Sequence, residues 1–536
     1  MKRVAKELHA GRARVQAHPF FRWLAADAVP LERRFVFSPV MIDFIMGFAD
    51  LNKWFLYYSE PQNDLERAIN QHTEEDRTHS RLFYENWYTL ALGELASWPA
   101  GKMLWWLFHS RDSGIVRSFG MELLALSTQY PDPLVRFPMM EAIEICGDVF
   151  FGHTAPVAAA LSREDGAAHD YFGKYHRDRE TGHLHADESI LWKSRLRPDQ
   201  VADAQLVVDR VYTAFCAVLD RLLDYVSRAS NYNALLLDLE EEFLDALAPP
   251  PALDRSAQPL SQRLVTPDPT QSRVWQHLQS RLARLDQHPF LAWLEEHTDV
   301  TPRDKLRGFL ALWGVDIAGY KDFNELVLSY PRPRNGFERT INRWTQNLAR
   351  HGALYLRDWH ALEMDRVVRW DAGETIAFYF LSRETEVHRH NMARVKRHAF
   401  RHSEPLLRFW LMKALESSGE PLFRRTAPLA EAVEGKYGVR LDYWGDRHQV
   451  SHAPGAATST EIDELFLTQS MTLAQGDAAC EIIDTVFDNI AEQFQLSLDV
   501  ASRQVFVRES SSLPPPRISA MIPAARDERE IERKVG

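Results

Sequence analysis

Apolar residues recur every three or four positions along most of this chain. The stretch DAQLVVDRVYTAFCAVLDRLLDYVSRA keeps this spacing over many turns, and PLLRFWLMKALESS and MDRVVRWDAGETIAFYFLS follow the same rule. Such spacing places the apolar side chains on one face of an α-helix, where they can be buried against neighbouring helices. Alternating strand patterns and Asn-Gly turn signals are nearly absent. The pattern therefore predicts an all-α protein built from amphipathic helices.

A long internal repeat divides the predicted helices into two sets. The segment ARVQAHPFFRWL recurs as ARLDQHPFLAWL, so that His18 matches His288 at an offset of 270. Farther along, FADLN matches YKDFN, which pairs Asp50 with Asp322 at an offset of 272. The offset stays at 272 for FHSRD and FLSRE, RFPMMEAIE and RFWLMKALE, and YFGKYH and YWGDRH. We therefore expect two copies of one helical unit, each with about six to eight helices.

Composition sets the boundaries of the two predicted units. The predicted domains are residues 1–246, a Pro-rich linker at 247–283, a second unit at 284–504 and a mobile tail at 505–536. The segment LAPPPALDRSAQPLSQRLVTPDPTQS is rich in Pro and polar residues, which is typical of a linker. The end of the chain, RESSSLPPPRISAMIPAARDEREIERKVG, has too few apolar residues to bury a core of its own.

Composition and charge also narrow the class of protein. The 536 residues carry a net charge of −12, which argues against nucleic acid as a partner. The three cysteines lack the spacing of disulfide or metal-binding motifs, which is typical of a reducing compartment. The N-terminus lacks the apolar core of a secretory signal, and the most apolar stretch, VMIDFIMGFADLNKWFLYY, is interrupted by Asp43, Asp50 and Lys53. We therefore expect a soluble, cytoplasmic protein with no membrane partner.

Histidines and carboxylates gather at helix-face spacing in the segment INQHTEEDRTHSRLF. His72 and His79 are seven residues apart, and Glu75 follows His72 by three residues and precedes His79 by four. At about 100° per residue, these three side chains share one face of a helix. Asp76 is an alternative to Glu75, because it precedes His79 by three residues. The segment therefore offers two imidazoles and a carboxylate within two helical turns.

A later segment, YFGKYHRDRETGHLH, offers the same kinds of side chain. Its His176, Glu180 and His183 occupy positions i, i+4 and i+7 of a predicted helix, which again share one face. The spacing His-x3-Glu-x2-His mirrors the His-x2-Glu-x3-His spacing of the earlier segment. Each segment alone is compatible with a solvated helix face, so the argument for chemistry depends on their combination.

A third carboxylate comes from the segment MMEAIEICGD. Glu144 is favoured over Glu141, because Glu144 matches Glu416 in the second unit whereas Glu141 matches Lys413. Two histidine-bearing helix faces with a carboxylate between them form a site for two metal ions, since a bridging carboxylate offsets the repulsion between two cations. Mixed imidazole and carboxylate ligands suit iron or manganese.

This combination of segments resembles the haem-oxygenase-like diiron oxidases and oxygenases, and the resemblance covers the whole of the first unit. Carried over residue by residue, it implies that the metal ligands and catalytic residues are Glu75, His79, Glu144, His176, Glu180 and His183. His72 and Asp76 are further candidates, His72 as a seventh ligand or as a hydrogen-bond donor to a ligand, and Asp76 in place of Glu75. The resemblance implies two tandem haem-oxygenase-like helical bundles, two irons that cycle between Fe2+ and Fe3+, and O2 as co-substrate.

The resemblance also implies a class of reaction. Diiron members of the family reduce O2 at two ferrous ions and oxidise a small metabolite, by N-oxygenation of an amine or by desaturation or C–C cleavage of amino or fatty acids. The expected partners are a small-molecule substrate and an external electron donor. Asp76-x2-His79 and Glu180-x2-His183 also resemble ferritin-like diiron bundles, an alternative fold that leaves His176 without a role.

The second unit keeps only part of this ligand set. At the offset of 272, the equivalents of the eight candidates are Trp344, Asn347, Leu348, His351, Glu416, His448, His452 and Gly455. Two metal dications need several anionic ligands, and among these residues only Glu416 carries a carboxylate. The second unit is therefore interpreted as a degenerate, structural copy that forms an intrachain pseudo-dimer with the first. A weaker alternative is that His351, Glu416 and His448 or His452 hold a single metal ion.

Two other functions compete with the diiron enzyme. One is a metal-free helical enzyme, similar to the thiaminase-like or quinone-cofactor-forming proteins, which have no need of two histidine-rich helix faces. The other is a non-enzymatic metal-binding protein, for which an acidic site with few histidines is typical. The sequence identifies neither the substrate nor the electron donor, and it leaves homo-oligomer formation open.

Overall fold

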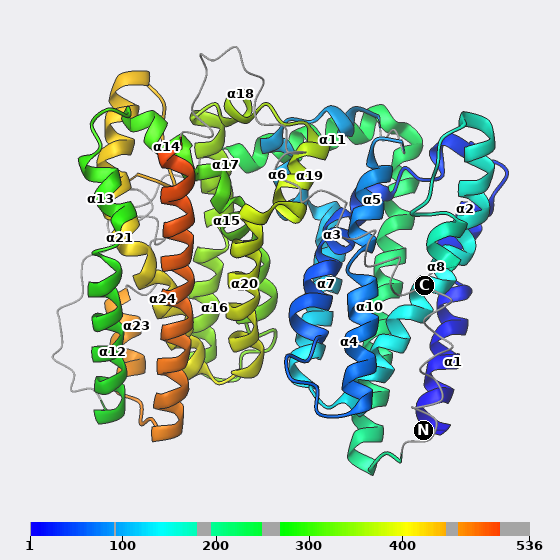
Figure 1. The fold of residues 1–536 in the computed structure, drawn as a ribbon, viewed down its shortest axis with the longest axis horizontal. Helices are drawn as coiled ribbons and strands as arrows, with labels where there is room; N and C mark the ends of the chain where they lie inside the picture. The colour runs from blue at the N-terminus through cyan, green and yellow to red at the C-terminus, as the bar shows by residue number, and fades with distance from the viewer. Residues whose placement is uncertain (1, 90–92, 179–194, 249–267, 446–458, 504–536) are drawn as a thin grey trace. The chain divides into compact units, whose positions relative to one another are not determined.

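The computed structural model describes residues 2–89, 93–178, 195–248, 268–445 and 459–503, and these residues confirm the all-α prediction (Figure 1). No β-strand occurs in these ranges, which contain α-helices joined by short 3-10 and π-helical turns. The predicted tail at 505–536 lies outside the described residues. Contacts between Cα atoms divide the chain into two compact units, which are taken in turn.

Unit 1 consists of Met1–Trp98 and Ser110–Phe243. Its long helices α8 and α10 pack on each other and on α1, while α7 packs on α10 and α3. The rings of Phe20, Phe37, Phe150 and Phe172 are buried and contact one another in the core between these helices. The helices are α1 Lys2–Gln16, α2 Pro19–Ala25, α3 Ile42–Leu51, α4 Asp64–Asp76, α5 His79–Trp87, α7 Arg111–Gln129, α8 Pro133–Asp165, α10 Pro198–Arg228 and α11 Tyr232–Leu247, which extends past the boundary.

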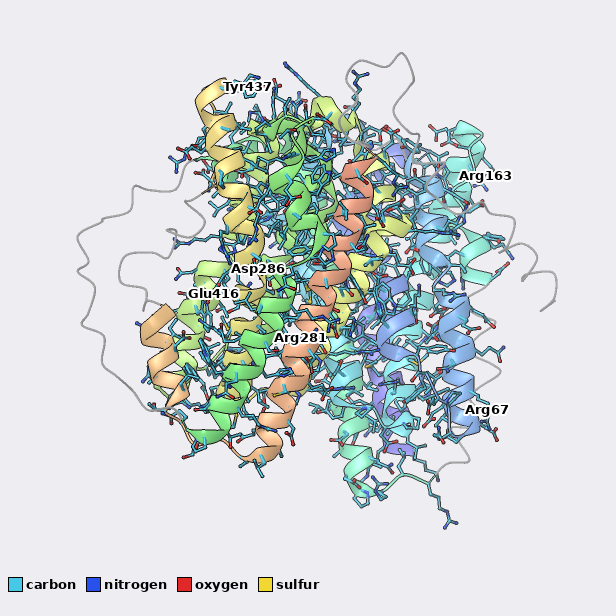
Figure 2. The ribbon with its side chains drawn as sticks, turned by 60° about the vertical axis from the view of Figure 1, so that its left-hand side comes forward. Arg67, Arg163, Arg281, Asp286, Glu416 and Tyr437 are labelled. Atoms are coloured by element: carbon cyan, nitrogen blue, oxygen red, sulfur yellow. The ribbon has the colours of Figure 1, made fainter. Side chains whose placement is uncertain are left out.

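Unit 2 consists of Pro99–His109 and Leu244–Gly536. Its helices α12, α21 and α24 pack on one another, and Arg281 of α12 pairs with Asp488 of α24 (Figure 2). The helices are α6 Ala100–Phe108, α12 Pro269–Leu285, α13 Pro289–Glu296, α14 Pro302–Leu310, α15 Gly314–Asp322, α16 Gly336–Leu348, α17 His351–Ala361, α18 Met364–Val368, α19 Ala372–Leu381, α20 Arg383–Arg401, α21 Pro405–Tyr437, α23 Ser459–Leu467 and α24 Leu473–Ser502.

The sequence repeat is also a repeat of secondary structure. The first and last residues of α4, α7 and α8 lie 272 positions before those of α16, α20 and α21. Local hydrogen bonds repeat as well: the Tyr58 amide donates to the Asn70 side chain at 2.7 Å, and the Tyr330 amide donates to the Asn342 side chain at the same distance. These three helix pairs therefore share their bounds even where their side chains differ.

The linker was predicted at 247–283, but its last part is helical and belongs to α12, so the predicted linker is too long. The Asp268 side chain caps the helix by accepting from the amides of Thr270 and Gln271, and Pro269 occupies the first helical position. Pro is common at the first position of a helix, because the N–H group that it lacks would have no hydrogen-bond partner within the helix there. The remaining residues of the predicted linker at 249–267 lie outside the described part of the chain.

Helix α6 belongs to unit 2, although its residues lie within the first sequence repeat. It packs on α15, α17, α18 and on α19, which is its own counterpart in the repeat (Figure 1). The Gly101 amide donates to the Asp365 carboxylate at 2.8 Å, and a Cβ at Gly101 would lie 2.8 Å from the Trp359 ring. Glycine permits this close approach. The predicted first domain at 1–246 is therefore interrupted in space at residues 99–109.

One stretch of unit 1, Leu31–Leu56, would be long and apolar enough to cross a membrane by length and composition. It includes α3 together with the short helical turns on either side. Of its most apolar 18-residue window, 61% is buried inside the protein. Burial of this kind is expected for an apolar stretch that packs in the core of a helical unit.

Candidate metal centre

Helix α4 brings two of the predicted candidates to the interior of unit 1. The Asn63 side chain caps its start by accepting from the Glu66 amide at 2.9 Å. Its buried face includes Leu65, Ile69 and Asp76. These residues are spaced by four and seven positions, so they form one stripe along the helix. Asp76 is therefore buried together with the apolar residues on the same face of α4.

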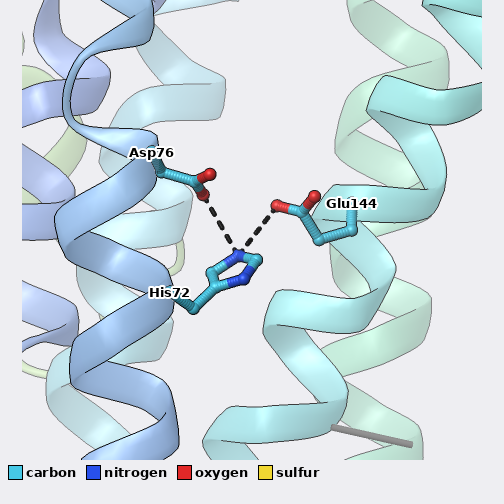
Figure 3. Close-up of side chains that lie close together, drawn as sticks. All are labelled: His72, Asp76 and Glu144. Carbon is cyan, nitrogen blue, oxygen red and sulfur yellow. Dashed lines mark hydrogen bonds and ion pairs between the residues drawn. The ribbon is translucent and has the colours of Figure 1, made fainter. Parts of the chain in front are cut away.

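The side chains of His72, Asp76 and Glu144 meet between α4 and α8 (Figure 3). His72 Nε2 lies 3.1 Å from Asp76 Oδ2 and 3.1 Å from Glu144 Oε1. The three donor atoms all lie within 4.8 Å of one another. The His72 side chain is 10% exposed, that of Asp76 2% and that of Glu144 5%, so the cluster is almost fully shielded from water.

The two buried carboxylates create a strong preference for positive charge at His72. Burial lowers the pKa of the His72 imidazole, but the carboxylates of Asp76 and Glu144 outweigh this effect and hold that pKa well above its usual range. Their negative charge and their hydrogen bonds to Nε2 both favour the protonated ring. In the metal-free protein the imidazolium therefore supplies the cation that this cluster attracts.

Two further imidazoles lie beside the cluster. His79 is the first residue of α5, and its Nδ1 is 4.0 Å from Asp76 Oδ1. The His79 ring centroid is 4.4 Å from that of His176, which is buried within the helical residues 174–178. Asp76 thus lies between His72 and His79, and His79 connects the cluster to His176.

Hydrogen bonds to main-chain groups fix the orientation of His176. Its Nδ1 is 2.8 Å from the Tyr171 carbonyl oxygen, which only accepts, so Nδ1 carries the proton and Nε2 carries the lone pair. Asn86 of α5 holds Tyr171 in turn, because its side-chain oxygen accepts from the Tyr171 amide at 2.6 Å. A histidine ligand typically has its second ring nitrogen held in this way.

The donor set fits a metal ion. One imidazole nitrogen and two carboxylate oxygens come together in the buried cluster, with His72 Nε2 3.1 Å from each oxygen. Imidazole nitrogen with carboxylate oxygen is a donor set suited to iron or manganese. A metal ion would replace the His72 proton as the positive charge between Asp76 and Glu144. In the described part of the chain, His72, Asp76 and Glu144 are the one group of three with this geometry.

The structure separates Asp76 from Glu75. The Glu75 carboxylate accepts a hydrogen bond from the Gln71 side chain at 3.2 Å in an exposed environment, one helical turn earlier on α4. Of the predicted candidates on α4, the structure brings His72 and Asp76 into the cluster, and Glu75 is not part of it. Glu144 is the carboxylate of the cluster on α8, and Glu141 is not part of it.

The remaining predicted ligands, Glu180 and His183, lie outside the described residues.

Two signals in the sequence point to Asp76. Asp76 continues the apolar stripe of α4, and His72-x3-Asp76-x2-His79 has the same spacing as His176-x3-Glu180-x2-His183. A search for identical spacing would have found it, whereas the mirrored spacing led to Glu75.

Unit 2 has apolar residues where unit 1 has the cluster. Trp344 and Leu348, the counterparts of His72 and Asp76, are buried on α16. Glu416 remains, but Lys413 Nζ lies 3.8 Å from its carboxylate and 2.9 Å from Asp463. A lysine ammonium already occupies the place of a counter-ion here, which disfavours a metal cation. The counterparts of His176, Glu180 and His183 lie outside the described residues.

No family model matches this sequence, and no curated protein is significantly similar to it.

Proposed function

We propose that unit 1 is a non-haem diiron oxidoreductase that uses O2 to oxidise a small metabolite. The observation that carries the proposal is the buried cluster of His72, Asp76 and Glu144, with donor atoms within 4.8 Å of one another. His79 and His176 lie next to it, which brings the described donors to three imidazoles and two carboxylates. Two irons bound there would supply the electrons that reduce O2.

The residues of this chain would hold and shield the metals. Asp76 lies between His72 and His79 on one side and Glu144 approaches from α8, so both carboxylates would help to hold the metals. The main-chain bond to Tyr171 presents the His176 lone pair. The burial of these groups excludes bulk water, which strengthens their interaction with a cation. Unit 2 would serve as the structural partner in an intrachain pseudo-dimer.

The test is iron content and O2 uptake in the full-length chain. After anaerobic loading with Fe(II) and removal of loose metal, we expect about two irons per chain. On addition of a reductant and air, iron-loaded protein should consume O2, and Glu144→Gln should lower both iron content and uptake. Iron that stays bound in Glu144→Gln, or O2 uptake that is independent of iron, would refute the proposal.

One observation favours a second candidate, a metal-free enzyme. His72 bonded to two buried carboxylates forms a charged, hydrogen-bonded cluster, and in a metal-free enzyme its protonated ring would be held in place to bond a substrate. The same loading experiment separates the candidates. A chain that binds no iron at neutral pH would favour the metal-free enzyme, and one that binds iron without O2 uptake in the presence of reductant would favour a metal-binding protein.

A further inference from the structure

Unit 2 contains a cavity of about 590 Å3 at the position that the metal cluster occupies in unit 1. Leu348, His351 and Glu416 line it, and these are the counterparts of Asp76, His79 and Glu144. The remaining walls come from α15, α20, α21 and α24 (Figure 2 labels Glu416 on α21). Its volume is in the range of pockets that hold small molecules.

Buried hydrogen-bond acceptors are concentrated in the wall of this cavity. Asp316, Asn391, Asn489 and Gln493 all line it and are at most 5% exposed. Each has a side-chain oxygen without a hydrogen-bond partner among the described residues. Buried polar atoms normally have partners, so four acceptors around one cavity suit a ligand that donates hydrogen bonds.

The orientation of the three amides is fixed by their nitrogen atoms. The side-chain NH2 of Asn391 donates to the Asn489 carbonyl at 3.2 Å, and that of Asn489 donates to the Asn391 carbonyl at 2.9 Å. The NH2 of Gln493 donates to Asp316 Oδ2 at 3.1 Å, and the same carboxylate is bonded to Nδ1 of His388. Rotating any of these amides would place an oxygen against an acceptor, so the oxygens stay available.

This polar wall is specific to unit 2. The counterparts of Asp316 and Asn391 in unit 1 are Phe44 and Phe119, whose ring centroids are 4.8 Å apart. The helical unit therefore folds with apolar residues at both positions. Burying a carboxylate and an amide there is costly, and a structural copy would have no need of them.

The chemistry of the wall defines the ligand. Three carboxyl groups line the cavity, those of Asp316, Glu416 and Glu420, against one guanidinium, that of Arg424. Lys413 pairs with Glu416, so the carboxyl groups of Asp316 and Glu420 are the ones left to attract a cation. Aromatic rings complete the wall, and indole and phenol rings attract organic cations through their faces. The aromatic lining residues are Trp313, Tyr320, Phe423, Tyr443, Trp444 and Phe494. We propose that this cavity in unit 2 binds an organic ammonium ion, a small molecule with a protonated amine and an apolar body. The binding site is independent of the iron proposed for unit 1.

Calorimetric titration of the full-length chain with tryptamine and phenethylamine tests the proposal. We expect saturable binding of at least one of these ammonium probes, and at least tenfold weaker binding of the matched neutral and acidic compounds, 3-ethylindole and indole-3-propionate. Equal binding of the neutral compound, or no saturable binding of either ammonium probe, overturns the proposal. Mn2+ is titrated in parallel: if it binds, and Asp316→Asn abolishes that binding, the cavity is a metal site instead.

Three variants locate the binding. Asp316→Asn removes the charge and should weaken probe binding at least tenfold, while Met392→Trp fills the cavity from α20 without changing the polar wall and should abolish binding. Asp499→Asn, on the exposed side of α24, is the matched control and should bind normally. Each variant is first checked by its melting curve, so that Met392→Trp still decides the question if Asp316→Asn does not fold. Normal binding by both cavity variants, or loss of binding in Glu144→Gln of unit 1, overturns the assignment.

Discussion

Neutralising Asp76 should weaken metal binding far more than neutralising its neighbour Glu75. The two residues are adjacent on α4, and Asp76→Asn and Glu75→Gln each remove one negative charge without changing the shape of the side chain. Asp76 Oδ2 lies 3.1 Å from His72 Nε2 in a buried cluster, whereas Glu75 bonds to Gln71 in an exposed environment. Only Asp76 is therefore placed to act on a bound cation.

The size of the effect follows from Coulomb's law. At an effective dielectric constant of about 20, unit charges about 3.1 Å apart attract by roughly 5 kcal/mol, and a dication attracts more strongly. The cation loses hydration on binding, and Asn keeps one ligand oxygen. We therefore expect Asp76→Asn to cost about 3 to 4 kcal/mol, which weakens binding roughly a hundredfold to a thousandfold. Glu75→Gln should change the dissociation constant by less than about threefold.

Anaerobic titration with Fe(II), with Co(II) as a spectroscopic substitute, measures both constants. Melting curves of the metal-free variants are the control, because Asp76→Asn also removes one of the two carboxylates that pair with His72. A loss in Glu75→Gln equal to or greater than that in Asp76→Asn would refute the assignment, and it would mean that α4 presents the other face to the metal.

Three further predictions concern other helices. Glu144→Gln should lower iron loading more than Glu141→Gln, measured by elemental analysis, because Glu144 belongs to the cluster; equal losses would contradict the orientation of α8. Gly352→Ala should destabilise the protein by about 1 to 3 kcal/mol in thermal unfolding, because the added Cβ would lie 2.4 Å from a histidine ring of the segment 99–109, whereas Gly120→Ala, which has open space, should be neutral or stabilising. Burial raises the pKa of Glu416 to about 7, so the folded state holds this proton more tightly than the unfolded state and stability should fall as pH rises from about 4.5 to 7; Glu416→Gln should remove up to roughly 3 kcal/mol of this dependence in urea unfolding, and an unchanged dependence would refute the cause.

Helix periodicity and the repeat predicted much of the fold because both are local properties. A single offset of 272 relates the bounds of three helix pairs, since a helix begins and ends according to its own caps and apolar face. The start of α12 was missed for a related reason. Pro269 follows the cap Asp268, and the same Pro-rich composition that indicates a linker also starts a helix.

The candidate site was predictable in its residue types but only partly in its geometry. His72, His79, Glu144 and His176 lie near one another, and helix spacing together with the repeat pointed to them. The choice between Asp76 and Glu75 depended on which face of α4 is buried, and the apolar stripe of Leu65 and Ile69, which Asp76 continues, already marks that face in the sequence. The hydrogen-bond acceptors of the unit 2 cavity come from three helices far apart in the chain, so no local sequence motif predicts that they lie together.

The placement of α6 has a consequence for how the protein is made. Eight of its nine residues are buried, among them Trp105 and Trp106, and the helix packs on segments that begin at Gly314, about 200 residues later. At a synthesis rate of about 5 to 20 residues per second, those partners leave the ribosome roughly 10 to 40 seconds after α6 does. During that interval an apolar, tryptophan-rich segment is without its native partners, so the nascent chain is a natural client for a chaperone. Cutting the gene between the repeats would make this exposure permanent, and the two halves are expected to be soluble only when they are produced together.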